Sequence, residues 1–186
     1  MPASVCRNHV VHTLPDFLAT STRDNTSFYN EAAIRIIDGE DGGIANKMSL
    51  MDISEHPSQP ERTPYELIGG ELKVRALVTR FYGLMDEDPD YFCIRKLHPE
   101  SLTGSREKLY MFLTGWLGGP QLYVEAYGHP RLRARHLPFL IGTSERDQWM
   151  ACMSRAMQDI DVPEALRLGL VASFANTADW MRNREL

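Results

Sequence analysis

The sequence predicts an all-α fold, and three observations carry that prediction. Four segments repeat their apolar residues at intervals of three and four, the spacing of a buried helical stripe. Glycine or proline lies at the boundaries of these segments, as expected where helices begin and end. No stretch alternates apolar and polar residues convincingly enough to indicate a strand. The 186 residues suffice for one domain with further chain outside it.

Composition excludes several classes of protein. The chain is 43% hydrophobic and 24% charged, with a net charge of −5, whereas proteins that bind nucleic acid are normally basic. No apolar run approaches the roughly 18–20 residues that span a bilayer, and the N-terminus lacks the features of a signal peptide. Three widely spaced cysteines do not suggest a disulfide framework. We therefore expect a cytoplasmic protein that binds neither nucleic acid nor membranes.

Residues 1–64 are predicted to form a largely irregular or flexible extension, followed by a folded domain over residues 65–186. Acidic residues outnumber basic ones in the extension, and its one compact apolar cluster, "EAAIRIIDG" (31–39), fits a helical turn or a short strand. The segment "HPSQPERTP" (56–64) holds three prolines, which is typical of a linker. A start at Met48 or Met51 would remove most of the extension, and the sequence leaves this choice open.

The first helix is predicted over residues 71–85, "ELKVRALVTRFYGLM", after Gly69 and Gly70. Its buried stripe comprises Val74, Leu77, Val78, Phe81, Tyr82 and Met85. The second helix is predicted over residues 105–117 with Ser105 as its N-cap, and Gly118-Gly119-Pro120 ends it. The stripe of this second helix comprises Leu109, Phe112, Leu113 and Trp116.

Two further long helices are predicted in the last third of the chain. One covers residues 143–160, where Ser144 and Asp147 have the spacing of a capping box. Its stripe comprises Trp149, Cys152, Met153, Ala156, Met157 and Ile160. The last runs from about Pro163, in the first turn, to Met181. Its stripe comprises Leu166, Leu170, Phe174 and Ala178.

The segment "GHPRLRARHLPF" (128–139) combines two histidines with three arginines. Pro130 and Pro138 bracket a short helix with Pro130 in its first turn, so His129 is an extended residue before it and His136 lies in its last turn. Two interpretations of His136 remain open from local chemistry. It could cap the helix C-terminus, or it could be a metal ligand, because a neutral imidazole is a good axial ligand of iron. Arginines nearby would then suit the propionates of haem.

From about residue 65 to residue 160 the chain resembles the group II truncated haemoglobins. The motifs that carry the resemblance are "YELIGG", "LVTRFYGLM", "KLYMFLTGWLGGPQLY", "YGHPRLRARHLPF" and "ERDQWMACM", in the family's order and close to its spacing. The resemblance implies a truncated globin fold, a two-over-two helical sandwich around haem b (iron protoporphyrin IX). The paired glycines 69–70 and 118–119 match the motifs that let this shortened fold turn.

The resemblance also assigns roles to individual residues. His136 matches the proximal ligand of the haem iron, and Tyr82 and Trp149 match the donors that stabilise a bound ligand on the distal side. His98 matches a distal wall position, where it would add a donor or order the tyrosine. Further matches in the haem pocket are Ser105, Leu109, Phe112 and Phe139. Lys108 and Arg135 are candidate partners of the propionates.

The function implied is reversible binding of dioxygen and other diatomic ligands. Two hydrogen-bond donors slow ligand release, which favours redox chemistry on oxygen, nitric oxide or peroxide over bulk oxygen transport. Whether the protein is an enzyme stays open: nitric oxide dioxygenase or peroxidase-like activity would need a separate electron donor, because no flavin or nicotinamide fingerprint is present. The alternative is a haem-based sensor or interaction protein that uses the extension. The assembly is expected to be a monomer or homodimer.

Overall fold

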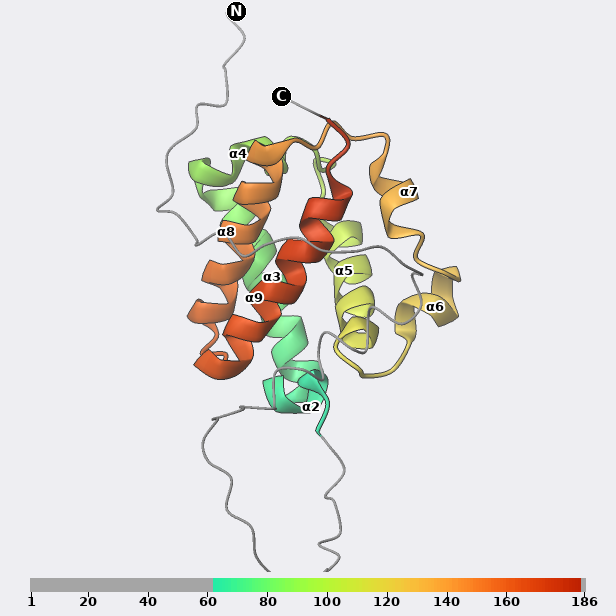
Figure 1. The fold of residues 1–186 in the computed structure, drawn as a ribbon, viewed down its shortest axis with the longest axis vertical. Helices are drawn as coiled ribbons and strands as arrows, with labels where there is room; N and C mark the ends of the chain where they lie inside the picture. The colour runs from blue at the N-terminus through green and yellow to red at the C-terminus, as the bar shows by residue number, and fades with distance from the viewer. Residues whose placement is uncertain (1–61, 185–186) are drawn as a thin grey trace, which may run out of the picture.

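The computed structural model describes residues 62–184, and every regular element in that range is a helix (Figure 1). The elements are α2 (Pro64–Ile68), α3 (Gly70–Glu87), the 3₁₀ turn η1 (Pro89–Tyr91), α4 (Phe92–Arg95), α5 (Thr103–Trp116), α6 (Leu122–Tyr127), α7 (Leu132–His136), α8 (Thr143–Asp159) and α9 (Glu164–Met181). The all-α prediction is confirmed. Expectations for the N-terminal extension fall outside the described residues, apart from 62–64. None of the helices in residues 62–184 is long and apolar enough to cross a membrane.

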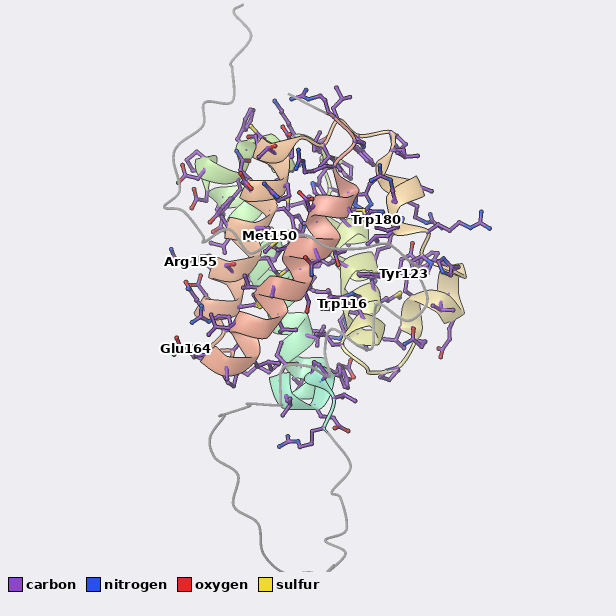
Figure 2. The ribbon with its side chains drawn as sticks, in the orientation of Figure 1. Trp116, Tyr123, Met150, Arg155, Glu164 and Trp180 are labelled. Carbon is purple, nitrogen blue, oxygen red and sulfur yellow. The ribbon has the colours of Figure 1, made fainter. Side chains whose placement is uncertain are left out.

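Four long helices form two packed layers. α3 packs on both α5 and α8, and α8 packs on α9, so that α3 and α5 face α8 and α9 (Figure 1). The predicted stripes meet between these layers, where Leu77, Phe81 and Met153 are fully buried. Charged side chains on the outer faces, such as Arg155 and Glu164, point away from the layers (Figure 2). Trp149 and Ile160, both on the predicted stripe of α8, are only partly buried.

Two predicted helix N-caps are wrong, by three residues for α5 and by two for α8. α5 begins at Thr103 after Leu102, so Ser105 lies inside the first turn and is not the N-cap. α8 begins at Thr143, as predicted, but its N-cap is Gly142 and not Ser144. The capping interaction comes from Glu145 in place of Asp147, because the Glu145 carboxylate accepts from the N–H of Gly142 at 2.9 Å.

The short helix α7 ends at His136, as predicted, but begins later than expected. Pro130 lies before it, and Arg131 takes the N-cap position with a φ of +44°. This left-handed backbone is uncommon for a residue with a side chain. The N–H of Arg131 donates to Nδ1 of His129 at 3.1 Å, so His129 stabilises the turn that leads into α7.

Tyr65, in the first turn of α2, lies close to a glycine of each predicted pair, Gly70 and Gly119. α2 is capped by Thr63, whose hydroxyl accepts from the N–H of Glu66 at 3.2 Å. α2 lies against the end of α5, because the N–H of Tyr65 donates to the carbonyl of Leu117 at 2.8 Å. A Cβ on Gly119 would lie 2.8 Å from ring carbons of Tyr65, so only glycine permits this close approach.

Candidate functional site

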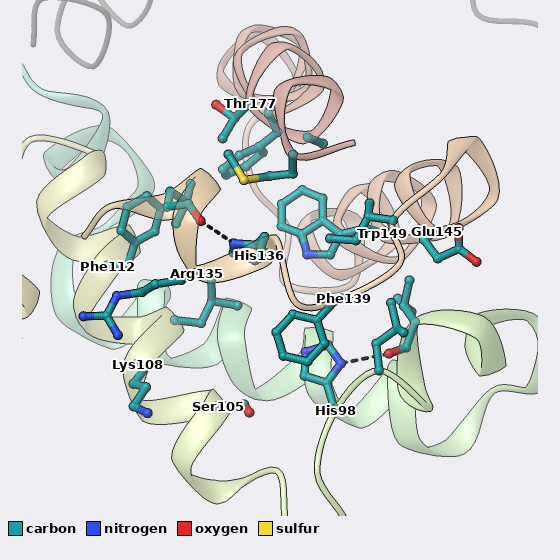
Figure 3. Close-up of a pocket in the computed structure, with 18 of the residues that line it drawn as sticks. His98, Ser105, Lys108, Phe112, Arg135, His136, Phe139, Glu145, Trp149 and Thr177 are labelled. Atoms are coloured by element: carbon teal, nitrogen blue, oxygen red, sulfur yellow. Dashed lines mark hydrogen bonds between the residues drawn. The ribbon is translucent and has the colours of Figure 1, made fainter. Parts of the chain in front are cut away.

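A cavity of about 380 Å³ opens between α7 and the two helix layers. Side chains from α3, α5, α7, α8 and α9 and from the turn after α4 line it, and Figure 3 shows many of them converging on the same space. The structure brings together every site residue predicted from the sequence. These are Tyr82, His98, Ser105, Lys108, Leu109, Phe112, Arg135, His136, Phe139 and Trp149. Their placement around one cavity is a finding, whereas their individual roles stay predictions.

His136 presents one ring nitrogen to an acceptor in its own helix. Its Nδ1 lies 2.7 Å from the carbonyl oxygen of Leu132, one turn earlier in α7 (Figure 3). A carbonyl can only accept, so Nδ1 carries the proton and Nε2 of the neutral ring keeps its lone pair. This is the arrangement in which a protein holds a histidine that ligates a metal.

The cavity is also lined by two aromatic rings with polar ends, Tyr82 and Trp149. The buried ring of Phe81 packs between them, with centroids 5.1 Å from Tyr82 and 5.6 Å from Trp149. Burial raises the pKa of the Tyr82 phenol, and a hydrogen bond with the Ser105 hydroxyl opposes that rise only in part. Tyr82 therefore keeps its O–H donor at neutral pH.

Trp149 reaches the cavity from α8. Within residues 62–184 no acceptor lies on its indole N–H. An indole N–H can only donate, so this group is available to a ligand in the cavity. Trp149 is only partly buried because its ring packs against the core on one side and borders the cavity on the other.

His98 lies in the turn after α4, and its Nδ1 donates to the carbonyl of Ile94 at 2.8 Å. Burial lowers the pKa of His98, and the charges of Arg95 and His136 lower it further, against the hydrogen bond to Ile94. The ring is therefore neutral, with Nε2 as an acceptor. A neutral His98 can order a neighbouring hydroxyl but cannot donate through Nε2.

Two cations stand at the edge of the cavity, while its interior is apolar. Lys108 and Arg135 are exposed and lie on the same side in Figure 3. Arg135 is oriented by a bond from its Nε to the carbonyl of Pro130 at 3.0 Å. Leu109, Phe112 and Phe139 supply apolar walls. An apolar slot with cations at its mouth and a lone-pair imidazole inside fits haem, which is a flat apolar ring bearing carboxylates.

Sequence reasoning missed the contribution of α9 and of the start of α8. Phe174, Thr177, Ala178 and Met181 line the cavity from α9, and Glu145 lines it from α8. Phe174 and Ala178 were predicted as packing residues, and an apolar cavity wall has the same helical spacing as a core. Phe174 in fact stacks on Trp116 at 4.6 Å and meets Trp149 at 5.7 Å between centroids.

Comparison with known proteins gives a consistent result. The family model for bacterial-like globins matches residues 63–183. The group 2 truncated haemoglobin YjbI of Bacillus subtilis is 40% identical over 126 residues, covering 68% of this chain and 92% of that protein. The solved group II 2-on-2 haemoglobin of Agrobacterium tumefaciens has a TM-score of 0.66 and 47% identity, covering 69% of this chain and 99% of that one. A truncated oxygen-avid haemoglobin from Bacillus subtilis has a TM-score of 0.61 and 40% identity, covering 66% and 100% respectively.

Proposed function

Because the chain belongs to the bacterial-like globins and is a group II truncated haemoglobin, we propose that it binds haem b through His136 and retains dioxygen with Tyr82 and Trp149. Binding of diatomic ligands at haem follows from membership of the family. The axial residue, the distal donors and the type of haem are the proposal. The observation that carries it is the convergence of these three side chains on one cavity.

The chemistry of the haem itself is to bind diatomic ligands when its iron is ferrous. His136 would hold the iron through Nε2, which keeps its lone pair while Nδ1 donates to the carbonyl of Leu132. Leu109 and Phe112 would exclude water from the haem, and Lys108 and Arg135 would pair with its carboxylates.

Tyr82 and Trp149 decide how long a ligand stays. Both offer donors to the cavity, and dioxygen at haem carries more negative charge than carbon monoxide. A hydrogen bond of this kind is worth about 1–2 kcal/mol, so each donor slows release by roughly 5- to 30-fold. One similar structure carries the description oxygen-avid, which agrees with a pocket of this kind.

A pocket that retains dioxygen suits redox chemistry better than bulk delivery. We therefore favour turnover of dioxygen with nitric oxide, or reduction of peroxide, over transport. Either reaction consumes electrons, so a separate electron-donor protein is part of the proposal.

The test is the rate of dioxygen dissociation, measured by stopped-flow absorption in wild type, Tyr82→Phe, Trp149→Phe and the double variant. Each single change is expected to accelerate release about 5- to 30-fold, with Tyr91→Phe, outside the cavity lining, as the matched control. Rates that match wild type in both single variants would overturn the distal assignment. Absence of a Soret band after reconstitution would overturn the haem proposal itself.

A further inference from the structure

The helix that carries His136 has little stability of its own. α7 comprises five residues, Leu132–His136, of which none is fully buried, and its N-cap makes no side-chain hydrogen bond. Helices this short are unstable in isolation, because nucleation costs more than a few hydrogen bonds return. Contacts with other parts of the chain must therefore hold α7 in place.

Asn183, which follows α9, contacts the end of α7 and the segment that comes directly after it. Its Nδ2 donates to the carbonyl of His136 at 3.1 Å and to the carbonyl of Phe139 at 2.8 Å. Its Oδ1 accepts from the N–H of Ile141 at 3.1 Å. The side-chain amide of Asn183 thus ties together the segment from His136 to Ile141, just before α8. Its donor and its acceptor are both in use.

Arg133 of α7 in turn contacts the end of α9. The Nη1 of Arg133 donates to the carbonyl of Trp180 and, at 3.2 Å, to the carbonyl of Arg182. The last carbonyls of a helix have no partner within that helix. Arg133 therefore caps the end of α9, while Asn183 caps the end of α7. The two helices cap each other's C-termini.

We propose that Asn183 and Arg133 form a latch that positions His136 for the haem, an inference that rests on the proposed function. α9 also lines the cavity through Phe174, Thr177 and Met181. The latch therefore fixes α7, which carries His136, in position relative to α9, which lines the same cavity. Asn183 and Arg133 do not line the cavity themselves, so they are positioning residues that act through His136 and its helix.

Asn183→Asp in the full chain tests the latch with almost no change in shape. The carboxylate can still accept from Ile141, but it cannot donate to the carbonyls of His136 and Phe139, and it places negative charge at the C-terminus of α7. Asn176→Asp is the matched control, because Asn176 is exposed on α9 and acquires the same charge. Asn183→Ala removes the side-chain donor and the side-chain acceptor together, and with them the hydrogen bonds to His136, Phe139 and Ile141.

Two measurements are made on each protein. Hydrogen–deuterium exchange should be at least several-fold faster over residues 132–141 in Asn183→Asp and unchanged in α3 and in residues 150–159 of α8. Transfer of haem to an excess of apomyoglobin should be roughly 5- to 30-fold faster, the range expected for loss of hydrogen bonds of this kind. The Asn176→Asp control should match wild type in both measurements.

Exchange in α7 equal to that of the control, or an equal increase in all helices, would overturn the latch. Faster α7 exchange with unchanged haem transfer would overturn its link to His136. Failure of the proposed function gives a different result. His136→Ala would then retain haem as wild type does, whatever the effect of Asn183→Asp on hydrogen exchange.

Discussion

The phenol ring of Tyr82 and the imidazole of His98 meet edge-on, with centroids 5.7 Å apart and an interplanar angle of 80°. One residue comes from the long helix α3 and the other from the turn after α4. Because Nδ1 of His98 is bound to Ile94, the ring cannot rotate freely, and it fixes one side of the space around the phenol. Substitution of His98 should therefore change the space around the Tyr82 phenol.

His98→Phe should make folding stability less sensitive to acid. The folded protein resists protonation of His98 because burial lowers its pKa below the ordinary value of 6.5, whereas the unfolded chain takes up the proton near that value. The unfolded state then binds more protons, so wild type loses stability as the pH falls through and below 6.5. Thermal unfolding followed by circular dichroism from pH 7.5 to 5 measures this loss. We expect a smaller loss in His98→Phe, and equal slopes in the two proteins would contradict the prediction.

His136→Ala should lose haem, while His129→Ala should keep it. Both histidines belong to the same basic segment, but only His136 lines the cavity, and His129 bonds the turn before α7. The Soret absorbance per protein after reconstitution and gel filtration measures haem content. Full occupancy in His136→Ala, with an unchanged spectrum, would remove His136 as the axial ligand.

Lys108→Gln and Arg135→Gln should each release haem about two- to fivefold faster. These exposed cations can pair with the carboxylates of haem, and exposed ion pairs contribute only about 0.5–1 kcal/mol. Arg131→Gln is the control from the same basic segment, because Arg131 does not line the cavity. The measurement is haem transfer to apomyoglobin at low and high salt. An effect that does not shrink with added salt would argue against pairing of charges.

Gly119→Ala and Gly83→Ala should change the free energy of unfolding in opposite directions. A Cβ on Gly119 would lie 2.8 Å from the ring of Tyr65 and 2.9 Å from the carbonyl oxygen of Thr114, so alanine should cost about 1–3 kcal/mol. At Gly83, inside α3, a Cβ meets nothing within 4 Å, and alanine should gain about 0.5–1 kcal/mol from helix propensity. Urea unfolding of both variants is the measurement, and a loss at both positions would show that the space at Gly83 is not free.

The four long helices could be predicted from the sequence because each buries a continuous stripe of apolar residues. Periodicity reports burial over several turns, so α3, α5, α8 and α9 were predicted close to their observed bounds. The shorter elements α2, α4 and α6 contain four to six residues each, too few to repeat a pattern. The N-caps were predicted wrongly at Ser105 and Ser144, because the observed N-caps, Leu102 and Gly142, carry no side-chain oxygen.

Site residues with a distinctive chemistry, such as a histidine, could be predicted from the sequence. Apolar residues that line the cavity from α9 could not. His136 stood out because two prolines isolate it at the end of a short basic helix. Phe174 and Met181 could not be separated from core residues, because an apolar wall and an apolar core have the same composition. Asn183 carried no local signal at all, since its partners lie 42 to 47 residues earlier in the chain.

That long separation has a consequence for biosynthesis. The ribosome delivers His136 well before Asn183, which follows it by 47 residues, so the nascent α7 lacks the amide that caps it until α9 has been made. If the proposed latch holds, a nascent chain that has not yet reached Asn183 would hold haem less stably through His136.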